Sequence, residues 1–350
     1  MMKKNMLLAL LLIAVFIFTT GNAYSAWTQP KGYAYNQLSY SFYKTDQKFS
    51  TLGYESDDID AAITDLDVDV SKRDSAEFTS HKITYYSEYG IIDDLTIFFS
   101  GGYDWQKSDD VIKFDENNGP SGIGDINLGL RYHLLDNIAG SGILMSVQGE
   151  VKIPEAYEYD NPITHLSLGD GQYDAKLALL LGRGFSKGYA WLNAGYKYRF
   201  ENKEHDPITF KPSDQVKISF GGGYPLTSWL SLGGLVDWTK SVGNAEVSDA
   251  LIFYNTQVGG GVPSHGDTVI IKDSLGLEPS ALSVGVDLIF DISKVATFMK
   301  DTFPSKSIVL SFVTEVEGFG AFKTEDYSLG RTYSIAFVFP GQGFFPVNLF

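Results

Sequence analysis

Hydrophobic and polar side chains alternate one by one along much of the chain. In residues 124–134 every second side chain is apolar or aromatic, from Ile126 to Leu134, and those between them are polar, charged or glycine. Residues 143–153 and 214–224 repeat this arrangement with few exceptions. A period of two residues is that of a β-strand, whose successive side chains point to opposite faces. Each stretch is about ten residues long, the length that a tilted strand needs to cross a bilayer.

The same pattern predicts about twelve strands. They cover residues 32–43, 77–89, 95–105, 124–134, 143–153, 173–182, 189–200, 214–224, 230–239, 282–290, 307–317 and 331–339. The connections alternate between short ones, such as 186–188, and long ones, such as 240–281. In bacterial outer-membrane barrels the short turns face the periplasm and the long loops face outside. One connection, 291–306, is long on the periplasmic side, and we expect a short helix near 293–300.

We therefore predict an all-β fold, a transmembrane up-and-down antiparallel β-barrel. Backbone groups cannot remain unpaired in lipid, so the strands must close on themselves. A soluble β-sandwich would share the period of two but would not explain the alternating lengths of the connections. A helical membrane protein is excluded, because no apolar run after residue 25 approaches the ~20 residues of a spanning helix.

The first 25 residues have the features of a signal peptide. Lys3 and Lys4 precede an unbroken apolar run over residues 6–18, and small residues at Ala23 and Ser25 offer a cleavage site that places the mature start near Ala26. An uncleaved anchor helix is the alternative. We assign residues 1–25 to the signal peptide, 26–340 to the barrel and 341–350 to a C-terminal tail, in which prolines interrupt the alternation.

Charge and cysteine content exclude several classes of function. The formal net charge is −16, and loss of Lys3 and Lys4 takes it to −18, so nucleic acid is not expected as a partner. The chain has no cysteine, which excludes disulfide-stapled folds and zinc–thiolate sites. These properties indicate a protein of the outer membrane of a Gram-negative bacterium, in contact with lipid and lipopolysaccharide, and without a cofactor.

If the apolar faces of the strands meet lipid, the opposite faces line the lumen and carry many charges. A dry apolar core would not explain these charges, because burying unpaired charged groups is costly. The candidate filter residues are Asp104, Asp125, Arg131, Glu150, Lys152, Asp174, Lys176, Lys197, Arg199, Lys217, Asp237, Glu315 and Glu317. Glu88 and Asp287 fall on the same face.

The order of the strands groups these charges by sign. Five cations, Lys152 to Lys217, fall on the fifth to eighth strands, and acids such as Asp237 and Glu315 fall on the ninth to eleventh. We expect a basic wall facing an acidic wall, with a transverse field that orients small polar or zwitterionic solutes. The alternative is that the charges pair with one another and seal the lumen.

No metal or catalytic site is predicted. The aspartates of the first long loop, among them Asp65, Asp67 and Asp69, lack the glycine and glutamate of a calcium loop and indicate a solvated acidic loop. The five histidines show no local pairing with serine or asparagine, although distant residues can assemble a triad. We therefore expect a protein that is not an enzyme.

Residues 122–132, GIGDINLGLRY, and residues 169–174, GDGQYD, resemble the signature segments of the MetA-pathway of phenol degradation family of outer-membrane proteins. The resemblance covers residues 122–200 in motif and most of the mature chain in layout. It implies a transporter-like barrel for hydrophobic or aromatic compounds, and it carries over no binding residue.

The predicted function is an outer-membrane channel or transporter that passes small solutes through a charge-lined lumen. One alternative is a transporter of hydrophobic or aromatic compounds, which would use the apolar exceptions on the inner face, Leu144, Leu180, Leu235 and Ile289. The other is a non-conducting barrel that sheathes a periplasmic protein partner.

Overall fold

The computed structural model describes residues 26–50, 71–108, 119–159, 166–259, 265–295 and 307–343. The predicted signal peptide, the central aspartates of the first long loop and the end of the predicted tail lie outside these ranges. Among the described residues, no helix combines the length and the apolar character that crossing a membrane requires.

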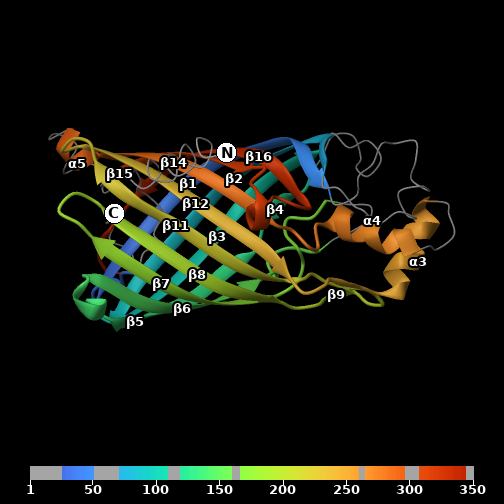
Figure 1. Cartoon of the computed structure of the whole chain (residues 1–350), viewed down its shortest axis with the longest axis horizontal. Coiled ribbons are helices and arrows are strands. Elements are labelled where there is room, and N and C mark those ends of the chain that lie inside the picture. Colours follow the sequence, from blue (N-terminus) through green and yellow to red (C-terminus); the bar gives the residue numbers. More distant parts are fainter. Residues whose placement is uncertain are drawn as a thin grey trace.

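Twelve antiparallel strands form one closed barrel (Figure 1). The strands are β1 (Tyr33–Ser50), β2 (Ser71–Ile92), β3 (Leu95–Ser108), β5 (Ile126–Leu135), β6 (Ile143–Ile153), β7 (Asp174–Gly184), β8 (Tyr189–Arg199), β11 (Asp214–Pro225), β12 (Leu230–Val242), β14 (Ala281–Asp291), β15 (Ser307–Val316) and β16 (Tyr327–Val338). Each predicted strand is confirmed, and so are the fold class and the number of strands.

The barrel closes where β16 pairs with β1. The register runs from Gln37 opposite Val338 to Phe49 opposite Tyr327, with one irregularity between Thr45 and Lys48. No strand of the wall therefore has a free edge, which satisfies the backbone within the apolar phase. A short strand, β17 (Gly341–Gln342), extends the pairing to the start of β1. The first residues of the predicted tail thus belong to the sheet.

The two faces of the wall differ as the alternation predicts. On β7, Leu177 is 63% exposed on the outer face. Asp174, on the inner face of the same strand, is buried. Outward side chains on other strands are also apolar, for example Leu130 of β5 and Val286 of β14. This apolar outer surface around a closed barrel is that of an outer-membrane protein, so the protein is placed in the outer membrane of a Gram-negative bacterium.

The two ends of the barrel are built differently. One end carries the short turns, together with the 3-10 turn η1 (Ile138–Gly140) and α5 (Ile292–Val295) (Figure 1). α5 confirms a helix in the 291–306 connection as far as the described residues reach. The other end carries the long connections and the 3-10 turn η3 (Gly320–Phe322). By the rule for bacterial barrels, the end with short turns faces the periplasm.

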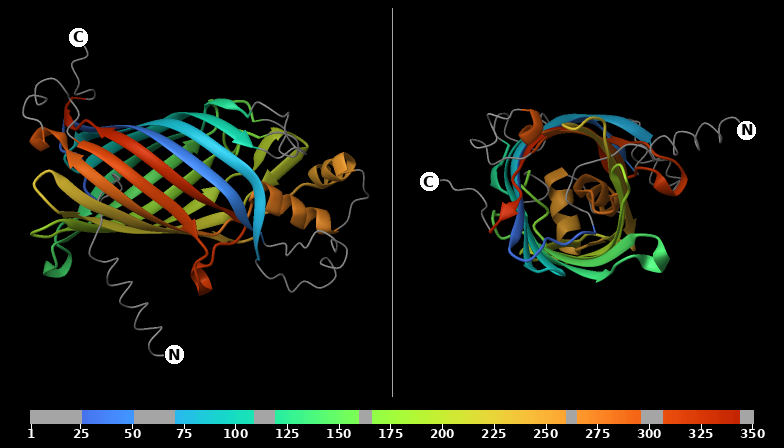
Figure 2. Two further views of the ribbon diagram at one scale, coloured as in Figure 1. Left: turned by 90° about the horizontal axis from the view of Figure 1, so that it is seen from above. Right: turned by 90° about the vertical axis from the view of Figure 1, so that its left-hand side faces the viewer.

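A small cap domain forms the extracellular end. It contains the sheet of β9 (Asn202–His205), β10 (Ile208–Lys211) and β13 (Glu246–Val247), and the helices α3 (Asp249–Gly259) and α4 (His265–Leu275). Its core consists of five side chains that are almost fully buried, Phe210, Ala245, Leu251, Ile271 and Leu277. Seen along the barrel axis from the periplasmic end, α3 and α4 lie in line with the bore (Figure 2). The sequence pattern did not predict these helices.

Candidate functional site in the barrel lumen

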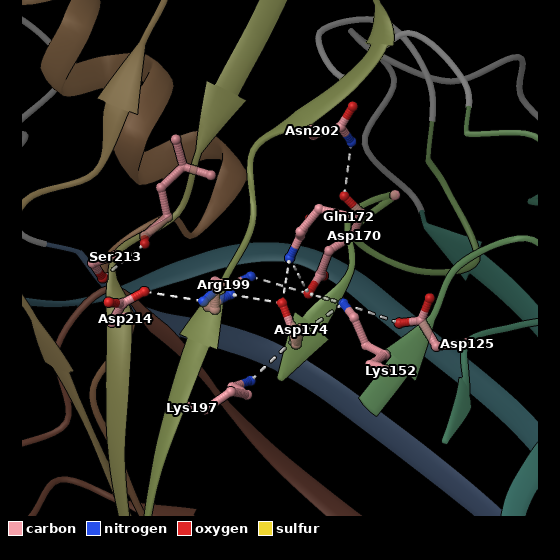
Figure 3. Close-up of polar contacts among 12 residues, drawn as sticks. Asp125, Lys152, Asp170, Gln172, Asp174, Lys197, Arg199, Asn202, Ser213 and Asp214 are labelled. Carbon is pink, nitrogen blue, oxygen red and sulfur yellow. Dashed lines mark hydrogen bonds and ion pairs between the residues drawn. The ribbon is translucent and has the colours of Figure 1, made fainter. Parts of the chain in front are cut away.

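The predicted lumen charges fall into one dense cluster and several smaller groups. The cluster lies on the inner face near the extracellular ends of β6, β7 and β8 and contains Asp125, Lys152, Asp174, Lys197 and Arg199 (Figure 3). The strand register brings them together, because Lys152 lies opposite Asp174 and Asp174 lies opposite Arg199. The loop before β7 adds two residues that sequence reasoning did not assign, Asp170 and Gln172.

Lys152 is the centre of this cluster. Its ammonium lies 3.3 Å from Asp125, 3.1 Å from Asp170 and 3.3 Å from Asp174. Asp125 is held in addition by the Tyr157 hydroxyl, which donates a hydrogen bond of 2.8 Å. Three carboxylates thus surround one ammonium, which is the kind of pairing that a charge inside a protein requires.

Arg199 is the second cation of the cluster, and its side chain is 5% exposed. Its Nη2 donates to Asp170 at 3.0 Å, and its Nε lies 3.8 Å from Asp174. Burial works to raise the pKa of Asp170, but the positive charges of Lys152 and Arg199 outweigh it and hold the pKa below its ordinary value. Asp170 therefore stays ionised and bridges the two cations.

The other predicted lumen charges form separate contacts. Lys176 pairs with Glu150 at 3.4 Å, and Lys217 pairs with Asp237 at 3.2 Å. Asp104 is buried and accepts a hydrogen bond of 2.5 Å from Ser80.

Two predicted acids lie at the extracellular end of β15. The Glu315 carboxylate accepts a hydrogen bond of 2.9 Å from the Gly330 amide. Glu317 is a correction: β15 ends at Val316, and Glu317 is exposed in the connection to β16. β15 pairs with β14 as far as Val316 and with β16 as far as Thr314, so Glu317 lies just beyond the paired wall.

The expected basic wall is also corrected. Inward acids accompany the cations on β6 and β7, where Lys152 faces Asp174 and Lys176 faces Glu150, whereas the inward charges of β8, Lys197 and Arg199, are both positive. On the opposite side the acidic character remains, since among the described residues neither Asp287 nor Glu315 forms an ion pair. The difference in charge between the two sides of the lumen is therefore smaller than the difference expected for a basic wall facing an acidic wall.

The N-terminal segment, residues 26–32, lies inside the periplasmic end of the lumen, and sequence reasoning missed it. Ala26 has no exposed surface, and its carbonyl accepts a hydrogen bond from Ser146. A Cβ on Gly182 would lie 2.9 Å from the Trp27 ring, so glycine at this position leaves room for the segment. The sequence gives no signal for this segment, because its polar and apolar side chains do not alternate and the pattern is that of a linker.

A buried ion pair holds this segment in place. Arg131 lies 3.0 Å from Glu88, and each side chain is 1% exposed. Arg131 also donates to the carbonyl of Trp27 at 3.0 Å, and Gln29 donates to Glu88 at 2.7 Å. Each partner of the pair therefore also makes a hydrogen bond to the N-terminal segment, which ties this segment to β2 and β5.

The Ser146 hydroxyl also lies 3.5 Å from His133, whose other ring nitrogen is 2.9 Å from Asp136. These three residue types make up hydrolytic triads. Here, however, Ser146 has no exposed surface, and its hydroxyl is engaged by the Ala26 carbonyl. The arrangement fastens the N-terminal segment and presents no accessible nucleophile.

A second buried group of charges ties the cap domain to the barrel. Lys48 of β1 lies 3.2 Å from Asp273 of α4 and 3.6 Å from Asp326, and it donates to the Asp273 carbonyl. Asp326 is 3% exposed and has a positive φ of 52°. Burial, with the neighbouring Asp273, raises the pKa of Asp326 to about 8. The contact therefore contains a carboxyl group whose burial favours the protonated form.

Comparison with known proteins gives the fold only. No family model matches the chain, and no curated protein sequence matches it. The structure of the COG4313 outer membrane channel from Pseudomonas putida F1 is similar over 92% of this chain and 100% of that chain, with a TM-score of 0.63 at 13% identity. The NanC porin covers 87% of this chain and 98% of its own, with a TM-score of 0.45 at 6% identity. The barrel fold that the family resemblance implied is thus confirmed.

Replacing Arg131 by methionine tests the buried ion pair. Arg131→Met leaves Glu88 charged and unpaired inside the lumen, and we expect the free energy of unfolding to fall by about 3–5 kcal/mol. The matched control is Lys203→Met, which breaks a pair with Glu201 whose lysine is 68% exposed, and this change should leave the free energy of unfolding almost unchanged. Urea unfolding in liposomes gives both values, and equal values would contradict the anchoring role of Arg131.

The contact around Asp326 predicts that attachment of the cap depends on pH. A carboxyl whose pKa is raised on folding stabilises the folded contact through its proton, fully below pH ~4 and progressively less as pH rises through 8. Hydrogen exchange in α4, corrected for its intrinsic pH dependence, should therefore accelerate as pH rises from about 4 to about 8 and change little above pH 8. Asp326→Asn should abolish this acceleration, whereas Asp249→Asn, at an exposed position of the cap, should retain it. Acceleration that persists in Asp326→Asn would contradict the assignment.

Proposed function

We propose that the chain is an outer-membrane channel that passes small polar solutes through a charge-lined lumen. The observation that carries this proposal is the inner face of the closed barrel, where charged side chains lie on consecutive strands beneath an apolar outer face. A barrel that served only as a scaffold would fill its interior with apolar side chains, because buried charges stabilise a protein poorly. Solutes that carry charge or hydrogen-bonding groups match such a surface.

Within this proposal the lumen charges act as a filter and not as catalysts. The cluster around Lys152 and the pair of Lys217 with Asp237 lie on the wall at the extracellular half of the bore. The N-terminal segment narrows the periplasmic end, and the cap domain lies over the other end. A solute would therefore pass the cap first, then the charged cluster, and last the N-terminal segment.

Dense ion pairing favours one competing interpretation, a lumen sealed by its own charges. Lys152 has three carboxylate partners, so its positive charge is largely neutralised by the wall itself. In this interpretation the barrel conducts nothing and its charged interior only holds the strands together.

The other two alternatives have less support. A transporter of hydrophobic compounds would need an accessible apolar surface, yet Leu180 is 1% exposed and Ile289 packs against the small wall cluster around Val309. A sheath for a periplasmic protein would need a free periplasmic opening, where Trp27 and Gln29 already lie. Contact with lipopolysaccharide at the extracellular end and a periplasmic partner of the tail remain proposals.

Single-channel conductance of the refolded mature protein in a planar bilayer tests the channel. We expect discrete steps in the wild type, and a shift of ion selectivity toward cations in the double variant Lys197→Glu and Arg199→Glu, because two lumen cations become acids. Lys187→Glu makes the same type of change in the exposed turn between β7 and β8 and should leave the selectivity nearly unchanged.

Two outcomes would count against the proposal. No conductance from a correctly folded barrel would contradict the open channel and support the sealed lumen. Steps whose selectivity moves equally in Lys187→Glu and in the double variant would show that general surface charge, and not the filter, selects the ions.

A further inference from the structure

The outward side chains of β3 mark the extracellular edge of the apolar band around the barrel. From Leu95 to Trp105 every second side chain is apolar, aromatic or glycine, and the next outward residue is Lys107, which is exposed. At ~3.3 Å per residue and a tilt of about 40°, this stretch rises ~25 Å along the membrane normal, the height of the apolar band in such barrels. Lys107 therefore lies at the level of the lipid headgroups of the outer leaflet.

An aromatic row runs along the same edge of the apolar band. The register places five side chains directly opposite one another on successive strands, namely Phe312, Tyr333, Phe42, His81 and Trp105. Their strands, β15, β16, β1, β2 and β3, lie side by side in the wall (Figure 1). Tyr333 is 49% exposed and Trp105 is 42% exposed, so this row is open to lipid. Aromatic girdles of outer-membrane barrels lie at the interface between lipid and water.

A basic row follows two residues beyond the aromatic row, on the same outer face. Arg331 of β16 lies directly opposite Lys44 of β1, and Thr79 of β2 separates Lys44 from Lys107 of β3. Like charges at directly opposed positions destabilise a sheet. The chain as a whole is acidic, with a formal net charge of −16. Three cations at one level of the outer wall of such a protein indicate an anionic partner.

The protein neutralises part of this charge itself. Lys44 pairs with Glu77 of β2, and both side chains are 43% exposed. An exposed ion pair of this kind contributes little to stability, so Lys44 remains able to contact a second anion. Arg331 is exposed, and among the described residues it forms no ion pair. The row therefore presents positive charge at the level of the lipid headgroups.

The far side of the barrel differs at this level. There the exposed hydroxyl of Tyr173 on the segment before β7 donates to Glu155, and that of Tyr196 on β8 donates to Asp214. Carboxylates thus accompany the outward tyrosines on the side of β7 and β8, whereas cations accompany the outward aromatic side chains on the side of β16, β1 and β3. The basic character belongs to one side of the wall and not to the whole rim.

We propose that Arg331, Lys44 and Lys107 bind the phosphate groups of lipopolysaccharide in the outer leaflet, while its acyl chains lie against the aromatic row. A guanidinium binds phosphate through two parallel hydrogen bonds, and an ammonium binds it as a point charge. The basic row extends over three strand spacings, ~14 Å, which favours a lipid with more than one phosphate group over a phospholipid with one. This inference concerns the outer wall and does not depend on the proposed channel function.

Native mass spectrometry of the mature protein, refolded in detergent, tests this site with purified diphosphoryl lipid A as the probe. We expect saturable binding to the wild type. Binding should be weaker by about tenfold or more in the triple variant Lys44→Gln, Lys107→Gln and Arg331→Gln, the loss expected for at least one charge-assisted hydrogen bond. Arg331→Gln alone, which breaks no ion pair among the described residues, should also weaken binding.

The matched control removes the same number of charges at exposed positions elsewhere and should bind lipid A as the wild type does. It is the triple variant Lys187→Gln, Lys203→Gln and Lys294→Gln. The heat-dependent mobility of each variant in electrophoresis shows that its barrel is folded.

Three results would overturn the proposal. The first is unchanged lipid A binding in the folded triple variant of the basic row. The second is an equal loss of binding in the control variant, which would show a general effect of net charge. The third is binding of phosphatidylglycerol, a lipid with one phosphate group, as tightly as lipid A, which would show that the wall does not distinguish lipopolysaccharide from an ordinary anionic phospholipid.

Discussion

The hydrogen bonds between β1 and β16 are the contacts on which the rest of the structure depends. They close the sheet, and without them two strand edges would lie unpaired in hydrocarbon, where each unsatisfied backbone group costs several kcal/mol. Closure also creates an interior that lipid cannot reach. Because side chains alternate along each strand, placing Leu177 in lipid requires that Lys176 and Ala178 face this interior. The inward direction of the charged side chains is thus a direct consequence of the apolar exterior.

Inside the lumen, the positions of the charges are set by register, and their pairing by distance across neighbouring strands. Lys152, Asp174 and Arg199 meet because three adjacent antiparallel strands bring the same level of the barrel into one row. The same logic places Arg131 beside Gln148 and within 3.0 Å of Glu88, where the pair holds the N-terminal segment. One set of inward positions therefore holds both the charged cluster near the extracellular end, which is the proposed filter, and the anchor near the periplasmic end.

The sequence predicted the strands well, because the period of two is a local signal that one residue of slippage would destroy. Residues 143–153 were predicted and observed with the same ends. The sequence could not show the contacts between residues that lie far apart in the chain. The acids that neutralise Lys152 come from three separate segments, and one of them, Asp170, lies in a loop without periodicity. The N-terminal segment and the cap helices also have no alternation, and their places depend on contacts with residues far along the chain, such as Arg131 and Lys48.

The central claim is that the inward side chains line a water-filled passage. The chain has no cysteine, so single cysteines can be introduced at Lys176, Lys197 and Lys217 on the inner face and at Leu177, Tyr196 and Ile218 on the outer face, and treated with a charged, water-soluble thiol reagent in liposomes. The structure predicts rapid modification of the three inner cysteines and protection of the three outer ones. Protection of the inner cysteines as well would contradict the claim and show that the lumen is sealed.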